Sequence, residues 1–333
     1  MAIMTQVPDH YVTAYETAWT HLVQQMESRF RDKAKVKPAE GAATRFNQYA
    51  ARTMASVSSR AAATTNTDAN LPVRWAYSAP YDDSALFDTW DNLFLGQVVL
   101  PTSETVQAQA YAWNRTVDQT LLTQLVSDGY KSTTGTTPSN GGAFAGGGVV
   151  PAIVAASFDT TNQLVAKDFV PFGGTAVNSG LTIAKIRRAK RKMDLAEVPN
   201  EGRNLAISSK ELEDLLATTE VTNQLYNSVR ALIDGDVDTF LGFNITRTEL
   251  LPWANTAQST LNYATNSAAS SSGLRTVIAW QKDMVGLIDG GKKAFMDVLP
   301  TQSHALQIRT TAVIGAARLQ ESGVVAIVCD TAA

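Results

Sequence analysis

Residues 185–192 combine side chains that could bind anions, with six lysines and arginines in eight positions. Cations at this density can hold phosphate or carboxylate groups. On a helix they would flank an apolar stripe at three- and four-residue steps, formed by Ile183, Ile186, Ala189 and Met193. Three interpretations stay open: a solvated face, a contact with acidic surfaces of neighbouring subunits, or a nucleic-acid contact. No aromatic residue is interleaved with these bases, which disfavours stacking on single-stranded bases.

Residues 286–292 match the first seven positions of a phosphate-binding P-loop, Gly-x-x-x-x-Gly-Lys. Lys293 stands where a serine or threonine hydroxyl would hold Mg²⁺. No hydrophobic strand of the usual kind precedes the motif and no clear helix follows it. A P-loop nucleotide-binding enzyme is therefore a remote alternative, and we interpret the segment as a turn.

Asp234, Asp236 and Asp238 alternate like the first ligands of a calcium loop. Thr239 stands at the glycine position of that loop, and Ile245 replaces the bidentate glutamate. We expect a helix stop and a turn rather than a metal site.

The sequence predicts no catalytic, cofactor-binding or metal-ligating residue. Cys329 is the single cysteine, which excludes an intrachain disulfide, and its apolar surroundings predict a small core residue. The three histidines, at positions 10, 21 and 304, are too few and too scattered for a histidine cluster. Carboxylate pairs such as Glu211 and Glu213 are interpreted as helix surface.

Composition indicates a globular chain with few charges. Hydrophobic residues make up 44% and charged residues 18%, and the net charge is −3. Soluble domains average about 25% charged residues, and interface cores are depleted in charge. The composition therefore fits either a protein that hides its surface in partners or a merely neutral one. No signal peptide or apolar run of membrane-spanning length is present, so we expect no membrane association.

The first third of the chain predicts a helix over residues 9–30 and a hairpin over residues 46–80. In the second strand of the hairpin, Val73, Trp75 and Tyr77 alternate with more polar positions. The tip, residues 55–70, has no apolar face of its own. Because isolated hairpins are marginal in water, we expect this tip to order only against a neighbouring subunit.

An acidic, aromatic patch follows at residues 81–91, with four aspartates and no base. Complementary charge steers association, so we expect this patch to meet the basic segments 29–45 and 185–192 within or between subunits. The predicted contacts between subunits are Arg74, Trp75, Tyr77, Asp82, Asp83, Asp88, Asp91, Arg187, Arg188 and Arg191.

A long helix is predicted from Thr102 or Ser103 to near Gly129, with a stripe that begins at Val106 and includes Val117, Leu121 and Leu125. Glycine-rich or low-complexity loops are predicted at residues 132–150 and 254–273. Further predictions are helices at 181–195, 211–217 and 222–233, a strand at 204–207, a strand region through 240–245, and a capping box formed by Ser208 and Glu211.

The last thirty residues predict two long strands that return as a hairpin. Residues 306–314 alternate like a half-buried strand, and residues 324–329 are continuously apolar, as in a strand buried on both faces. We expect a tight turn at residues 320–323 and a break at the small residues 315–317.

This order of elements resembles the major capsid proteins of tailed phages with the Hong Kong 97-type shell fold, and short motifs are similar to those of podovirus-type members. The motifs are Tyr81-Asp-Asp with Asp88 and Asp91, Arg115-Thr-Val-Asp118, Gly202-Arg203-Asn-Leu-Ala-Ile-Ser208, Gly242-Phe-Asn-Ile, Pro252, and Gly315 with Gly323-Val-Val-Ala-Ile. The resemblance implies an α+β fold with an N-terminal arm (1–45), an E-loop hairpin (46–90), a peripheral domain with a long spine helix (91–135), an inserted axial domain (136–285) and return strands of the peripheral domain (286–333).

The function implied by the resemblance is a self-assembling structural subunit and not an enzyme. It would form hexamers and pentamers of an icosahedral phage head around double-stranded DNA, in the virion and, during assembly, in the host cytoplasm. A separate scaffolding protein and a portal are the implied partners. No lysine and asparagine match a crosslinking pair, so we predict no covalent crosslink. The alternative is a cellular nanocompartment shell protein of the same fold.

Overall fold

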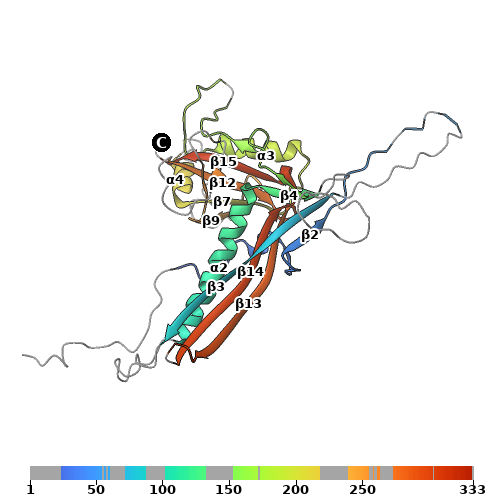
Figure 1. The fold of residues 1–333 in the computed structure, drawn as a ribbon. Helices are drawn as coiled ribbons and strands as arrows, with labels where there is room; N and C mark the ends of the chain where they lie inside the picture. The colour runs from blue at the N-terminus through green and yellow to red at the C-terminus, as the bar shows by residue number, and fades with distance from the viewer. Residues whose placement is uncertain are drawn as a thin grey trace, which may run out of the picture. The chain divides into compact units, whose positions relative to one another are not determined.

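The computed structural model describes residues 24–54, 56–57, 59–60, 72–87, 102–132, 153–171, 173–217, 239–254, 258, 261–262, 273–302 and 304–331. Figure 1 shows a mixed α+β fold with two sheets. Within these residues the helices are α2 (Thr102–Val126), α3 (Ile183–Leu195) and α4 (Ser209–Ala217), with short 3₁₀ helices η2 (Arg31–Lys33), η4 (Lys282–Met284) and η5 (Glu321–Gly323).

Internal contacts divide the chain into two compact units. Unit 1 consists of Met1–Ser28, Pro80–Thr116 and Gly291–Val313. Unit 2 consists of Arg29–Ala79, Val117–Gly290 and Ile314–Ala333.

The first sheet has seven strands. Their order is β1 (Lys35–Lys37), β13 (Val285–Leu299), β14 (Ala305–Arg318), β3 (Val73–Phe87), β4 (Gly129–Ser132) and β5 (Ile153–Ala156), and β2 (Ala43–Asn47) pairs with β3. The β2–β3 pairing is antiparallel and runs from Ala43 opposite Tyr77 to Asn47 opposite Val73. This confirms paired strands at the base of the predicted hairpin, whose tip lies mostly outside the described residues.

The second sheet has eight strands and lies in unit 2. The order is β11 (Leu261–Asn262), β10 (Trp253–Ala254), β12 (Leu274–Gln281), β7 (Arg203–Ile207), β9 (Phe243–Arg247) and β8 (Thr239–Phe240), and β15 (Val324–Asp330) pairs with β12 and with β6 (Leu164–Val165). All six residues of the apolar run 324–329 are buried, as predicted. The predicted strand region through 240–245 is a hairpin with a two-residue turn, in which Leu241 and Gly242 have φ of 51° and 86°.

The predicted closing hairpin is wrong, although both of its strands exist. β14 lies between β13 and β3 in the first sheet, whereas β15 pairs with β12 and β6 in the second. A strand that is apolar on both faces is most stable inside a sheet covered on both sides, and β15 occupies such a place. The turn at Glu321–Gly323 therefore passes the chain from one sheet to the other. A Cβ at Gly323 would overlap Met284, so this turn requires glycine.

The predicted break at residues 315–317 is also wrong, because β14 continues to Arg318. Gly315 instead allows β14 to pack closely against its neighbouring strand. A Cβ on Gly315 would overlap the backbone carbonyl of Tyr77 on the neighbouring β3. The predicted alternation before it is confirmed, since Ile308, Thr310 and Ile314 are buried.

The P-loop-like motif lies inside the 15-residue strand β13 and is not the predicted turn. Gly291 has φ of 72°, a conformation that suits glycine, and the chain remains extended on both sides of it. A phosphate-binding loop needs a helix directly after it, so the segment lacks the required structure.

The predicted N-terminal helix is wrong for residues 24–30, which are not helical, and residues 9–23 lie outside the described part. The backbone N–H groups of Arg29 and Phe30 donate to the buried Asp118 carboxylate, at 2.9 and 3.2 Å, instead of to helical carbonyls. The Phe30 ring packs edge-on against Trp280, whose indole N–H donates to the Lys33 carbonyl at 2.9 Å. These contacts hold Arg29 and Phe30 against Asp118 of α2 and Trp280 of β12.

The long helix α2 is confirmed. Val117, Leu121 and Leu125 of its predicted stripe are buried in unit 2, but Val106 is exposed. In unit 1 the buried position is Gln109, which donates to the Ile308 carbonyl at 3.1 Å and accepts from the Thr310 hydroxyl at 2.7 Å.

The predicted helix 222–233, the carboxylates at 234–238 and most of both predicted loops lie outside the described residues. None of the described helices is long and apolar enough to cross a membrane.

Candidate functional site

The basic helix is α3, and Thr182 caps its first turn by accepting from the Lys185 backbone N–H. The predicted stripe of Ile183, Ile186, Ala189 and Met193 is buried, as expected. α3 packs on β15 and β6 through this face. Of the three predicted contact residues on the helix, Arg187 and Arg191 are exposed, and the Arg188 guanidinium lies 5.5 Å from the centre of the Phe169 ring.

Lys185 corrects the expectation that all bases of this helix cover its surface, because it is completely buried. Its ammonium donates to three backbone carbonyls, those of Ser179 (2.6 Å), Gly180 (3.0 Å) and Val328 (3.2 Å). Three donors meet three acceptors, so the buried charge is fully hydrogen-bonded. Burial lowers the pKa of Lys185, which nearby acidic groups only partly offset. The lysine joins the loop before α3 to β15.

A surface hollow of about 440 Å³ lies along the exposed side of α3; we call it the α3 hollow. Its lining residues are Arg187, Lys190, Arg191, Asp194, Leu195 and Leu241. The Asp194 carboxylate is paired with the buried Arg203 at 2.7 Å. Lys192 turns away and donates to the carbonyls of Thr161 (3.2 Å) and Asn162 (2.8 Å).

The predicted contact residues on β3 differ in exposure. Arg74 is partly buried and forms an ion pair with Glu321 at 3.0 Å. Trp75 is half-buried, and the exposed Tyr77 packs edge-on against Tyr130 at 4.8 Å between ring centres. In this segment of β3 the buried residues are Val73 and Ala76. The predicted alternation of Val73, Trp75 and Tyr77 therefore does not correspond to a single buried face of the strand.

The acidic patch is described only in part. Asp82 forms an ion pair with Arg309 at 3.1 Å, and both side chains are about half exposed. Asp83 is exposed, and its backbone carbonyl accepts from Gln109. Asp88 and Asp91 lie outside the described residues.

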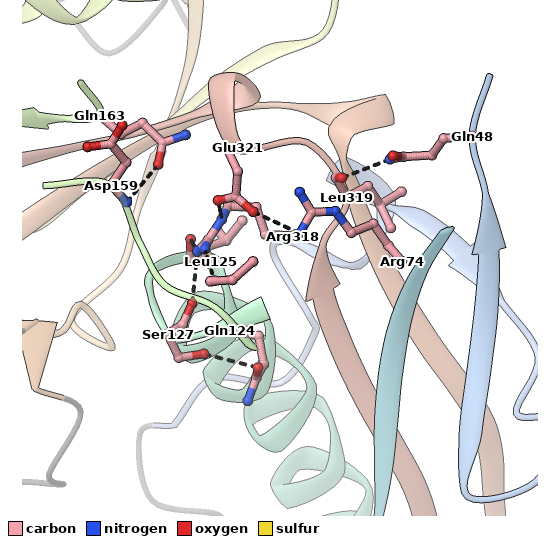
Figure 2. A network of polar contacts seen from close by, with 11 residues as sticks. Gln48, Arg74, Gln124, Leu125, Ser127, Asp159, Gln163, Arg318, Leu319 and Glu321 are labelled. Atoms are coloured by element: carbon pink, nitrogen blue, oxygen red, sulfur yellow. Dashed lines mark hydrogen bonds and ion pairs between the residues drawn. The ribbon is translucent and has the colours of Figure 1, made fainter. Parts of the chain in front are cut away.

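A polar junction around Arg318 was not expected from the sequence (Figure 2). The Arg318 side chain is fully buried and donates to the carbonyls of Leu125 (2.9 Å), Ser127 (2.8 Å) and Ala156 (3.1 Å). It also donates to Glu321, which lies between Arg318 and Arg74. The last carbonyls of a helix have no partner within it. Arg318 therefore completes the C-terminal end of α2 and fastens it to β14 and β5. One feature of the sequence could have indicated this junction. Arg318 is the one charged residue among the small or apolar residues 312–319, and Glu321 follows it three positions later.

Glu211 corrects another expectation, because this carboxylate is buried and not on the helix surface. The predicted capping box holds in one direction: the Ser208 backbone N–H and hydroxyl both donate to Glu211, the former at 3.1 Å. α4 begins at Ser209, two residues before the predicted start. Burial raises the pKa of Glu211, although Arg275 and the Ser208 N–H act against this.

Replacing Glu211 by glutamine should raise the free energy of unfolding at pH 7 by up to about 1 kcal/mol, because a neutral amide can accept the Ser208 hydrogen bonds without burying charge. The folded-state pKa lies above the unfolded value, so the protonated carboxyl stabilises the fold at low pH and this contribution is lost as pH rises through the folded pKa. Denaturant unfolding from pH 4 to 8 should show the gain of Glu211→Gln vanish at acidic pH. A constant difference across this range would contradict the prediction.

No group of three or more histidine, cysteine, aspartate or glutamate side chains could hold a metal ion in the described part of the chain. Cys329 is fully buried, and burial raises the pKa of its thiol well above the usual range.

Comparisons with known proteins found one family and several solved structures that are similar to this chain. Residues 7–331 match the family described as phage capsid protein. No match is found among curated proteins. Among solved structures the chain is similar to the capsid of cyanophage P-SCSP1u, with 15% identity and a TM-score of 0.66 over 96% of this chain and 93% of that one.

Two further capsids have the same fold. The capsid of cyanophage Pam1 has 13% identity and a TM-score of 0.65, with all of both chains covered. The capsid of Helicobacter pylori bacteriophage KHP30 has 12% identity and a TM-score of 0.63, with 99% of both chains covered.

Proposed function

Because this chain belongs to the phage capsid protein family and is a structural subunit of an icosahedral phage head, we propose that its copies assemble as hexamers and pentamers around double-stranded DNA. The observation that carries this conclusion is the family match, which extends over nearly the whole chain. Self-association and a place in the virion follow from the family. A separate scaffolding protein, a portal and assembly in the host cytoplasm complete the proposal.

The proposed domain organisation is the one that the resemblance to tailed-phage capsid proteins implies. The chain would consist of an arm (1–45), an E-loop (46–90), a spine-helix region (91–135), an axial domain (136–285) and return strands (286–333). The continuous 25-residue helix α2 supports the proposed spine helix. The pairing of β2 with β3 supports the proposed E-loop.

The rival functions have less support. The solved structures compared above are phage capsids, and this similarity does not favour a cellular nanocompartment shell protein. A P-loop nucleotide-binding enzyme is not supported either, because the P-loop-like motif at residues 286–292 lies within the strand β13.

The contacts between copies remain those named from the sequence, with different support for each. Asp82, Asp83, Arg187 and Arg191 are exposed and can reach a neighbour, as can the exposed ring of Tyr77. Arg74, Trp75 and Arg188 are partly covered by their own chain, so a neighbour would touch only their outer atoms.

The purified chain, alone or co-expressed with a scaffolding protein, should form closed shells visible by negative-stain microscopy.

The rate of shell assembly should depend on salt. Exposed charges act over about 30 Å at 0.01 M salt and about 8 Å at 0.15 M, so light scattering should show assembly slowing severalfold over this range. A stable monomer under both expression conditions would refute the assembly proposal. Salt-independent rates would refute only the electrostatic contacts.

A further inference from the structure

Within the part of the chain that the structure describes, three of the six bases of residues 185–192 have no partner and are available to another molecule. Lys185 is buried on three carbonyls, Arg188 lies over Phe169, and Lys192 is hydrogen-bonded to the loop at 161–162. The other three show no hydrogen bond or ion pair to any described residue. These are Arg187, Lys190 and Arg191.

The three available cations share one place. Their spacing of three and four positions puts them on the same side of α3, and all three line the α3 hollow. The carboxylate in the hollow, Asp194, is already paired with Arg203, whose guanidinium also donates to the carbonyls of Val198 (2.5 Å) and Pro199 (3.0 Å). Neighbouring like charges on a helix are unfavourable. The hollow therefore favours an incoming anion.

The surroundings fit an acidic polypeptide better than a nucleic acid. Leu195, 72% exposed, and Leu241 line the same hollow and offer apolar contact. Directly after the helix, Glu197 and Glu201 are exposed and would repel a phosphate backbone that continued past it. The cationic surface is thus short and bordered by negative charge, with room for a few carboxylates and an apolar side chain.

We propose that the α3 hollow is a contact between copies of this chain, in which Arg187, Lys190 and Arg191 bind exposed carboxylates of a second copy. The inference rests on the proposed function, which supplies identical copies as neighbours. A ring of copies pairs two different surfaces of the same chain. Exposed carboxylates for the other surface are present, among them Asp83 and Glu213.

The first test is the double reversal Arg187→Glu with Arg191→Glu. Shell yield, measured by sedimentation and microscopy, should fall at least tenfold while thermal unfolding of the unassembled subunit stays unchanged. The matched control is Arg247→Glu with Lys282→Glu, which alters two exposed bases of the same unit, outside the predicted contact segments, by the same charge. The control should assemble like the unmodified chain.

Each outcome separates this inference from the proposed function. If the unmodified chain forms no shells, the proposed function fails. If it does and the Arg187/Arg191 variant assembles equally well, only the inference fails. An equal loss of shell yield in the Arg187/Arg191 variant and in the control would be an effect of net charge and would overturn the inference. Normal shells with reduced DNA content in the Arg187/Arg191 variant would also overturn it, because they would indicate a nucleic-acid contact.

The second test uses a carbodiimide, which joins an amine to a contacting carboxylate. Shells formed from isotope-labelled and unlabelled copies should contain mixed-label peptides that join Lys190 to an aspartate or glutamate, and unassembled subunits should lack them. A crosslink from Lys190 only to another protein, or only within one copy, would overturn the inference.

Discussion

Replacing Arg318 by alanine is expected to lower the free energy of unfolding of the unassembled subunit by about 3–5 kcal/mol, because this side chain is fully buried and each buried acceptor left without a donor costs about 1–3 kcal/mol. Three backbone carbonyls would lose their donor, and Glu321 would keep only Arg74 as its cationic partner. Denaturant unfolding followed by tryptophan fluorescence measures the loss.

Arg318→Lys keeps the charge but cannot reproduce the planar fork of guanidinium donors, so it should recover only part of the stability. It also keeps the test informative if the alanine variant does not fold. The matched control is Arg309→Ala, which removes the arginine of the half-exposed pair with Asp82. Exposed ion pairs contribute at most about 1 kcal/mol. Equal losses for Arg318→Ala and Arg309→Ala would show that the junction is not a major source of stability.

Replacing Lys185 by methionine should lower the free energy of unfolding by about 3 kcal/mol, because a side chain of similar length would leave three buried carbonyls without donors. Lys190→Met is the control on the same helix, since the Lys190 amine has no described partner. Its effect should stay within about 0.5 kcal/mol. Similar values for the two variants would refute a structural role for the buried ammonium.

The Lys185 effect should also depend on pH. Burial lowers the folded-state pKa of Lys185. Between that value and the unfolded one, the unfolded chain binds more protons, so the stability of the unmodified protein rises with pH there. The methionine variant lacks this group. The difference in stability between the unmodified chain and the Lys185→Met variant should therefore widen as pH rises from neutral towards 10, and a difference that narrows would contradict the assigned burial.

Local patterns predicted the elements that depend on neighbours in sequence. The stripe from Ile183 to Met193 defined α3, and Ser208 with Glu211 marked the start of α4. The apolar run 324–329 identified a strand covered on both faces. These features need no knowledge of distant residues, because a helix stripe or a strand period repeats within a few positions.

The errors concern distant partners. β15 could have paired with β14, the nearest strand in sequence, but its partners are residues 274–280 and 164–165. From the sequence, Lys185 and Glu211 were predicted to be surface charges, because polar side chains are mostly exposed, and the sequence made no prediction for Arg318. Lys185 and Arg318 are each bound by three backbone carbonyls, which have no sequence signature. For Glu211 the capping box predicted the partner, Ser208, but not the burial. For the candidate contacts, composition and charge suggested the surface of α3, but only the structure separated the three available cations from the three satisfied ones.

The position of β15 also bears on how the protein is made. β12 and β6 come from residues synthesised much earlier, yet the strand that joins them begins only at Val324. Until the ribosome has produced that stretch, the edge of β12 that pairs with β15 is unpaired. The inner face of α3 lacks one of the two strands on which it packs, and the Lys185 ammonium lacks the Val328 carbonyl. A nascent or prematurely terminated chain therefore cannot complete this unit. The second sheet is therefore completed only by the last strand of the chain to be synthesised.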